Sequence, residues 1–235
     1  MIGNNFSSVL YFLEKSVFLQ KNKKMTKANF REWTLDKIDA TFQTTQVDTH
    51  PLLTRLQNYA YEITATEREY LTNLRDSYRL YGGDDWNEAE LENKIISPLF
   101  VLSKVDNKAF SYFLERELTA IIGDYDLAGR VDGMIATGFR SPKKPYFCMH
   151  EYKRESDPTG DPKGQALIEM IVAQHINDNT KPIYGLYIVG NKWRFMVLTG
   201  KEYALGESFL ADSEDIFDIF RCLKALRYEI EQLIK

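Results

Sequence analysis

The sequence predicts a mixed α/β (α+β) fold in which a central mixed β-sheet is flanked by helices. The chain has 235 residues, of which 44% are apolar and 27% are charged, and these values suit one domain with a full hydrophobic core. Near Tyr125 the pattern changes from helical spacing to the short apolar runs that are typical of strands. From there on we expect two strands, a helix, two strands and a helix, an order that places helices against a sheet.

Residues 1–80 are expected to form a helical extension, and residues 81–235 the main domain. Apolar side chains recur near helical spacing over much of the extension, and Pro51 is well placed to open a helix there. No catalytic grouping stands out in this part, so we interpret it as an appendage that packs on the core. Residues 1–24 are interpreted as a non-native or disordered extension upstream of a chain that starts at Met25.

The main domain is expected to begin with a strong helix at Trp86–Leu102, in which Pro98 introduces a kink. Asp85 or Asn87 can cap this helix, because their side chains accept hydrogen bonds from the free backbone N–H groups of a first turn. A second helix is expected at Ala109–Ile122. The remaining expected elements are strands at 126–137, 145–154, 183–189 and 191–199, an edge strand at 203–210, a helix at 164–177 opened by Pro162, and a final helix capped by Asp212 or Ser213.

The charges are placed unevenly along the chain. The formal net charge is −4, which excludes a uniformly basic coat for nucleic acid but leaves room for a local basic patch. Five acids and no base lie in Asp84–Glu92, and six acids and no base lie in Glu202–Asp218, so the rest of the chain is net positive. Two interpretations stay open, a random scatter of charges or a basic surface that faces a polyanion.

The cysteine and histidine content narrows the compartments and metals that we expect. Two cysteines and three histidines are too few for a disulfide framework, a cysteine-based zinc site or a histidine-rich metal site. This usage favours a reducing, cytoplasmic setting. No run of about 18 or more apolar residues occurs, so we expect no transmembrane helix and no membrane partner.

A carboxylate and an amine share one face of the second predicted strand. Glu151 and Lys153 are two residues apart, and alternate side chains of a strand point the same way. Such a pair can hold a divalent cation and polarise a water, although an exposed ion pair is the alternative. On the preceding strand Asp132 lies among apolar and small residues, where a carboxylate is costly to bury unless it is paired or bound to metal. Its alternative role is a hydrogen bond within its own hairpin turn.

Two further polar residues lie on the helices that flank these strands. Glu88 is an acid on the core-facing stripe of its helix, which it shares with Leu91, Ile95, Leu99 and Leu102. It is expected to reach the same cation, or else to be a first-turn acid stabilised by the helix dipole. Gln165 lies in the first turn of the helix after the second strand, where it could contact a phosphate, orient a water or remain an exposed polar residue.

These pieces, in this order, resemble the PD-(D/E)xK nuclease superfamily. More narrowly, over about Trp86–Thr199 they resemble the N-terminal nuclease domain of the motor subunits of type I restriction enzymes. Val131 replaces the usual proline before the aspartate, and Glu169 replaces the aromatic residue often found four positions after the glutamine. No helicase motif follows. The motifs that carry the resemblance are Asn87-Glu88-Ala89-Glu90 with Ile95-Ile96-Ser97-Pro98-Leu99, Gly129–Gly133, His150–Arg154 and Gly164–Leu167.

The resemblance implies a restriction-endonuclease-like core and a stand-alone metal-dependent deoxyribonuclease, a hydrolase of DNA phosphodiester bonds in restriction, defence or DNA repair. The implied ligands of one or two Mg²⁺ (or Mn²⁺) ions are Asp132, Glu151, the carbonyl of Tyr152 and, directly or through water, Glu88. Lys153 is implied to orient or help deprotonate the attacking water, and Gln165 to position that water or the lysine. The bases expected to bind DNA phosphates are Arg130, Lys143, Lys144, Arg154, Lys163, Lys192 and Arg194.

Two other interpretations of the same residues stay open. One is a catalytically idle nuclease-fold module that binds DNA or protein, against which the intact acidic and lysine positions argue. The other is a protein unrelated to nucleic acid, whose carboxylates are structural. The sequence also leaves open the choice between DNA and RNA, the cleavage of ends or interior bonds, and whether the chain acts alone, as a homodimer or with a partner protein.

Overall fold

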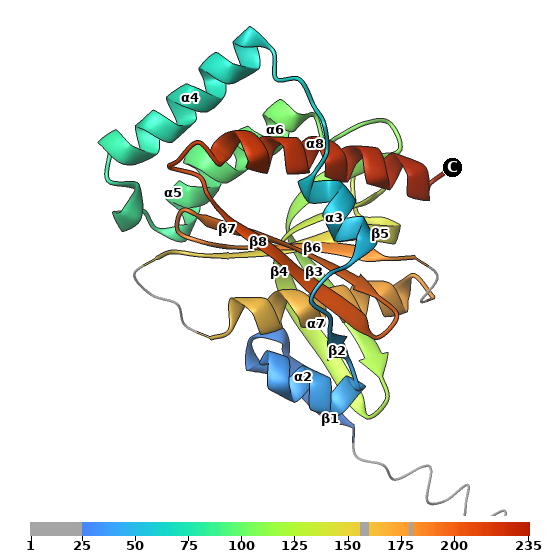
Figure 1. Cartoon of the computed structure of the whole chain (residues 1–235). Coiled ribbons are helices and arrows are strands. Elements are labelled where there is room, and N and C mark those ends of the chain that lie inside the picture. The colour runs from blue at the N-terminus through green and yellow to red at the C-terminus, as the bar shows by residue number, and fades with distance from the viewer. Residues whose placement is uncertain (1–24, 156–159, 179–180) are drawn as a thin grey trace, which may run out of the picture.

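The computed structural model describes residues 25–155, 160–178 and 181–235. The interpretation given for residues 1–24, and the stretch 156–159 before the helix expected at 164–177, lie outside these ranges. An eight-stranded mixed sheet forms the centre of the molecule, with helices on both of its faces (Figure 1). The predicted fold class is therefore confirmed. Among the described helices, none combines the length and apolarity that a membrane span requires.

The sheet follows the order β1-β4-β5-β6-β7-β8-β2, and β3 also pairs with β4. β5 and β6 run parallel, whereas β3–β4, β4–β5, β6–β7 and β7–β8 are antiparallel pairs. All five strands that the sequence predicts after Tyr125 are present. The strands are β1 (Thr26–Asn29), β2 (Thr45–Gln46), β3 (Phe110–Ile122), β4 (Tyr125–Thr137), β5 (Lys143–Lys153), β6 (Ile183–Val189), β7 (Lys192–Thr199) and β8 (Glu202–Leu210).

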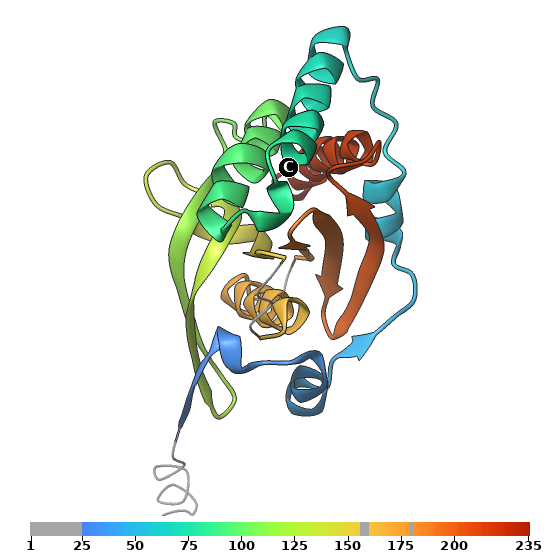
Figure 2. The ribbon, with the colours of Figure 1, turned by 90° about the vertical axis from the view of Figure 1, so that its left-hand side faces the viewer.

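One helix, α7 (Pro162–Ile176), lies in the hollow of the sheet. Figure 2 shows the sheet curving around it, with β3 and β4 on one side and β7 and β8 on the other. All residues from Gly164 to Gln174 are buried, as expected for a helix that is largely apolar on every side. Pro162 occupies the first turn, and the Asp161 side chain accepts a hydrogen bond from the backbone N–H of Lys163. The helix therefore begins where the sequence predicts.

The N-terminal segment closes the other side of α7. β1 and β2 belong to it, together with α2 (Leu35–Phe42). Trp33 and Ile38 are completely buried in the same cluster as α7, and a Cβ atom at Gly164 would lie 2.5 Å from the Trp33 carbonyl oxygen, so only glycine permits this approach. β1 pairs with β4, and β2 with β8. The expectation of an all-helical extension is wrong for these two strands, because their partners lie far along the chain. The domain boundary at residue 80 stays a prediction.

The opposite face of the sheet is covered by several helices, which lie above the strands in Figure 1. They are α3 (Pro51–Gln57), α4 (Ala65–Leu80), α5 (Glu88–Leu91), α6 (Ser97–Ser103) and α8 (Ile216–Leu233). Pro51 opens α3 as predicted. The final helix is present as α8 and buries an apolar face, although the residue that precedes its first turn is Asp215 rather than the predicted Asp212 or Ser213.

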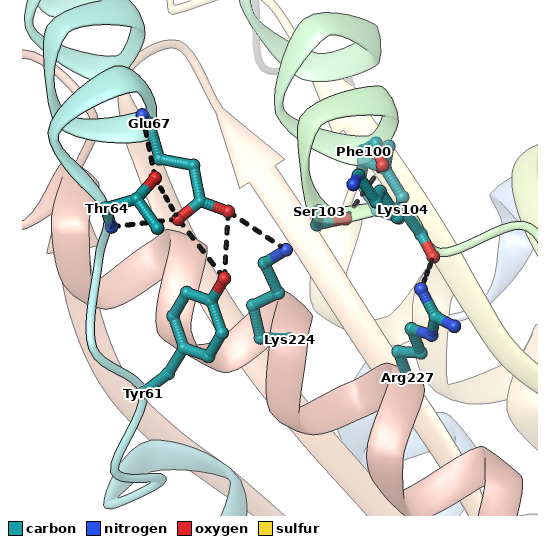
Figure 3. A network of polar contacts seen from close by, with 8 residues as sticks. All are labelled: Tyr61, Thr64, Glu67, Phe100, Ser103, Lys104, Lys224 and Arg227. Atoms are coloured by element: carbon teal, nitrogen blue, oxygen red, sulfur yellow. Dashed lines mark hydrogen bonds and ion pairs between the residues drawn. The ribbon is translucent and has the colours of Figure 1, made fainter.

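Hydrogen bonds and ion pairs connect these covering helices to one another (Figure 3). The Glu67 carboxylate of α4 accepts a hydrogen bond from the Tyr61 hydroxyl at 2.9 Å and lies 3.2 Å from Lys224 Nζ of α8. Arg227 Nη1 of α8 donates to the carbonyl of Lys104, at the end of α6, over 2.8 Å. These contacts link α4 and the end of α6 to α8.

The helix predicted at Trp86–Leu102 is present but interrupted. Between α5 and α6 the backbone makes a wider, π-helical turn at Glu92–Ile96. Pro98 lies just after this turn and lacks the N–H that a regular helix would use, which accounts for the expected distortion. Asn87 caps the start of α5 with its side chain, as predicted.

The prediction of a helix at Ala109–Ile122 is wrong, because this segment forms β3. The strand has 13 residues and pairs with β4 from end to end, with a gap in the pairing at Glu115. Its side chains do not alternate cleanly between buried and exposed, and Glu115 has a φ of 54°, so the period of two that marks a strand is blurred. Pairing with β4 across a tight hairpin outweighs the weak local preference of the sequence.

Candidate functional site

The predicted site lies where β4 and β5 separate. The pairing between these strands ends at Gly133 and His150, whereas β5 continues alongside β6 as far as Lys153. Beyond that point the carboxylate of Asp132 takes the place of a backbone partner, because Asp132 Oδ2 accepts a hydrogen bond from the backbone N–H of Tyr152 at 3.0 Å. The middle of β4 therefore holds a carboxylate against the end of β5.

Lys153 joins the strands to the helix that begins at Glu88. Its Nζ lies 2.5 Å from Oε1 of Glu151, on the same strand face, and 3.6 Å from Oε1 of Glu88. Glu151 is completely buried, while the Glu88 side chain is 49% exposed. The structure thus brings one acid from the helix, Glu88, and one from the strand, Glu151, to the same lysine. Glu151 and Lys153 share a face of β5, as the sequence predicts.

The Asp132 and Glu151 carboxyl groups interact strongly. Burial, followed by the negative charge of Asp132, raises the pKa of Glu151 to about 8. Burial also raises the pKa of Asp132, although the Tyr152 backbone N–H acts in the opposite direction. Burial alone would lower the pKa of Lys153, but the neighbouring carboxylates outweigh it and raise that pKa. Two carboxylates this close repel unless a proton or a cation lies between them.

The helix α7 supplies two further polar side chains to this place. Gln165 and Glu169 are one turn apart, and both are buried. Neither carboxyl oxygen of Glu169 has a hydrogen-bond partner of good geometry among the described residues. Burial, followed by the charges of Glu151 and Asp132, raises the pKa of Glu169 well above its usual value. In the sequence Glu169 stands out only as a departure from the glutamine motif, so its place beside these acids was not predicted.

The residues were tested for their fit to a divalent cation. Among the described residues, no group of three or more His, Cys, Asp or Glu side chains is arranged to hold a metal ion. The Asp132–Glu151 pair still suits Mg²⁺, because this ion keeps several waters and binds through one or two carboxylates. The Glu151 carboxylate is buried and forms an ion pair with Lys153 through Oε1. Oε2 has no hydrogen bond in the described part of the chain, so it is open to a cation. The Tyr152 carbonyl stays a predicted ligand, and Glu88 lies beside Lys153.

The bases predicted to bind DNA divide into three sets. Arg194 is used by the fold, since its Nε donates to the Gly206 carbonyl at 2.6 Å. Lys143 and Lys144 lie at the start of β5, the opposite end from Lys153, and a strand of this length spans roughly 30 Å. The structure therefore does not bring these two lysines to the site. The bases at the site end of the strands or the start of α7 are Arg130, Arg154, Lys163 and Lys192.

The chain was compared with family models, curated proteins and solved structures. No family model and no curated protein matches the chain. Among solved structures, a cryoEM structure of a DrdV–DNA complex is similar, with a TM-score of 0.41 and 13% sequence identity. The similarity covers 68% of this chain and 13% of that one, so this chain spans a small part of the DrdV chain.

Proposed function

We propose that this chain is a metal-dependent nuclease of the PD-(D/E)xK type that hydrolyses DNA phosphodiester bonds. The observation that carries the proposal is the meeting of Asp132, Glu151 and Lys153 at the point where β4 and β5 separate. A buried carboxylate pair beside an ammonium group combines the requirements of phosphodiester hydrolysis, a cation site and a positive charge near the attacking water.

The residues of the site divide the work of the proposed reaction. Asp132 and Glu151 would hold Mg²⁺, which when bound supplies Lewis acidity and lowers the pKa of a water. Lys153 keeps its charge, since its carboxylate neighbours raise its pKa, and it would orient the attacking water and offset the charge that develops on the phosphate. Glu88 holds the lysine from the helix side at 3.6 Å. Gln165 would position the water or the lysine.

The burial of acids with few or no partners supports a functional role over a purely structural one. A buried carboxyl without a hydrogen bond costs free energy, and folds that need only stability satisfy or avoid such groups. Glu169 is buried without a hydrogen bond among the described residues, and Glu151 is buried with one close partner there, the ammonium group of Lys153. Acids in these positions beside Asp132 are what we expect of a cation-binding site.

The arginine and lysine side chains around the site would bind the phosphates of the substrate. Arg130, Arg154 and Lys192 are exposed there, and Lys163 is half-buried in the first turn of α7. Arg130 is paired with Glu115 at 2.6 Å, so part of its charge is already balanced. Contacts of these bases with phosphates would release counterions and make binding weaken as salt rises.

The test is a cleavage assay on the intact chain with Mg²⁺, Mn²⁺ or EDTA. The substrates are plasmid, linear duplex, single-stranded DNA and RNA. We expect cleavage to require the cation and to fall by about a hundredfold or more in Lys153→Ala and in Asp132→Asn. Lys201→Ala, which removes an exposed lysine at the turn between β7 and β8, is the matched control and should cleave normally.

Two outcomes would contradict the proposal. Cleavage that survives both Lys153→Ala and Asp132→Asn would show that other residues carry the activity. A wild-type chain that binds nucleic acid but cuts none of the substrates would favour the alternative, an idle nuclease-fold module that binds DNA or protein.

A further inference from the structure

The loop between β4 and β5 exposes an aromatic side chain. Phe139 is 89% exposed, more than any other large hydrophobic residue in the described part of the chain. The loop lies at the end of β5 that is remote from Lys153. Its position therefore separates it from the site described above, and the proposed chemistry gives it no role.

Hydrogen bonds and a tight turn hold this loop in place. Gly138 has a φ of 107°, and a Cβ atom there would lie 2.2 Å from the Ser141 carbonyl oxygen, so the turn requires glycine. Thr137 Oγ1 lies 2.9 Å from the carbonyl oxygens of both Lys143 and Lys144. Because both ends of the loop are tied down, the fold itself presents Phe139 to solvent.

The loop is positively charged. From Gly133 to His150 the chain contains no acid, and its three bases are Arg140, Lys143 and Lys144. Lys144 Nζ lies 3.0 Å from Asp178 Oδ2. Arg140 and Lys143 are exposed and form no ion pair within residues 25–155, 160–178 and 181–235. Two unpaired cations thus lie in the same loop as an exposed aromatic ring.

We propose that this loop binds single-stranded nucleic acid, with Phe139 stacked on an unpaired base and with Arg140 and Lys143 on the neighbouring phosphates. Aromatic rings that stack on bases and cations that follow the backbone are the two elements of such binding. The choice of nucleic acid as the partner rests on the proposed function. The loop itself is a second contact, remote from the bond that is cut.

The composition of the loop favours nucleic acid over a lipid surface. Membrane-binding segments bury a broad apolar face in the interface, whereas this loop offers one apolar side chain. Stacking needs one ring for each base, and Phe139 supplies it. Charge complementarity with a phosphate backbone is provided by the two unpaired cations.

The position of the loop sets a minimum length for the substrate. β5 has 11 residues, so the start of β5, where the loop joins it, is roughly 30 Å from Lys153. Nucleic acid in a stacked strand advances about 3.4 Å per nucleotide. A substrate therefore has to be longer than about nine nucleotides to reach the loop and the site together.

The experiment measures binding of labelled oligothymidine by the intact chain in EDTA, where no cleavage competes. A 20-nucleotide strand is compared with a 6-nucleotide strand and with a 20-base-pair duplex, over several salt concentrations. We expect Phe139→Ala to weaken binding of the 20-nucleotide strand about tenfold, and to change duplex binding much less. Arg140→Gln should lower the slope of log affinity against log salt by about 0.7. Tyr81→Ala, which removes another exposed ring (71%), is the control and should change neither quantity.

The results also separate this proposal from the proposed nuclease activity. If wild type and Phe139→Ala bind the 20-nucleotide strand equally, or if Phe139→Ala abolishes binding to phosphatidylserine vesicles instead, the proposal is wrong. If the chain cuts nothing but loses single-strand affinity in Phe139→Ala, the loop contact stands and the nuclease proposal fails. If the chain cuts DNA but Phe139→Ala and Arg140→Gln leave its single-strand affinity unchanged, the nuclease proposal stands and the loop proposal fails.

Discussion

Two buried glutamates, one on each side of the sheet, are treated by the fold in opposite ways. On α8, Glu229 accepts hydrogen bonds from Arg55 Nε at 3.0 Å and Nη2 at 2.9 Å, and from the Tyr184 hydroxyl at 3.1 Å. On α7, Glu169 has no such partner in the described residues. A satisfied carboxylate fastens helices together, whereas an unsatisfied one lowers stability.

The pKa values of Glu229 and Glu169 shift in opposite directions, in keeping with this difference in hydrogen bonding. The hydrogen bonds from Arg55 lower the pKa of Glu229, although burial acts in the opposite direction. At Glu169 burial comes first, and the charges of Glu151 and Asp132 add to it, so the pKa rises well above its usual value. Perturbed acids that cluster in this way are typical of functional sites. The contrast therefore separates a structural carboxylate from the acids that we propose serve catalysis.

The largest expected effect on stability comes from Glu229→Met. It removes the partner of Arg55 and leaves the buried Tyr184 hydroxyl without an acceptor, so the free energy of unfolding should fall by about 2 kcal/mol. Urea denaturation at neutral pH measures this change. An unchanged urea midpoint would mean that the Glu229 contacts contribute nothing to stability. Glu229 would then not differ from Glu169 in the way described above.

The same substitution on the other side of the sheet should act with the opposite sign. Glu169→Met places an apolar side chain of similar size where a carboxyl has no partner, so the free energy of unfolding should rise by about 1 kcal/mol. The measurement is urea denaturation in EDTA. A loss of stability as large as that of Glu229→Met would show that Glu169 is structurally satisfied and would break the comparison.

A smaller effect is expected in acid. Because the pKa of Glu229 is lowered in the folded chain, this carboxylate stabilises the fold above its unfolded pKa of about 4.5, and the contribution is lost as the pH falls through the lower folded value. The stability gap between wild type and Glu229→Gln should therefore narrow from about pH 7 to about pH 3. A gap that stays constant over this range would contradict the lowered pKa.

The convergence of the strand residues was accessible from the sequence, because it follows from short-range geometry. Glu151 and Lys153 are two positions apart on a strand, so they share a face whatever the rest of the fold does. Asp132 lies on the neighbouring strand of a hairpin, which limits where its side chain can go. The roles of these residues stay proposals, and only their placement is given by the structure.

The remaining features depend on long-range packing that no local pattern records. Glu169 lies in a helix that is buried on every side, so no polar face marked it in the sequence, and its environment arises from the curvature of the sheet around α7 (Figure 2). β3 shows no clean alternation, and β1 and β2 are too short to carry a period. The remoteness of Lys143 from Lys153 follows from the length and direction of β5.

The most direct test of the account is calorimetric titration of the intact chain with Mn²⁺, since its central claim is that the Asp132–Glu151 pair holds a divalent cation. Three proteins are compared, the wild type, Glu151→Gln at the site, and Glu229→Gln as the matched buried control. We predict that the wild type and Glu229→Gln bind Mn²⁺ equally, and that Glu151→Gln binds at least about tenfold more weakly. Equal binding by Glu151→Gln, or no binding by the wild type, would contradict the account.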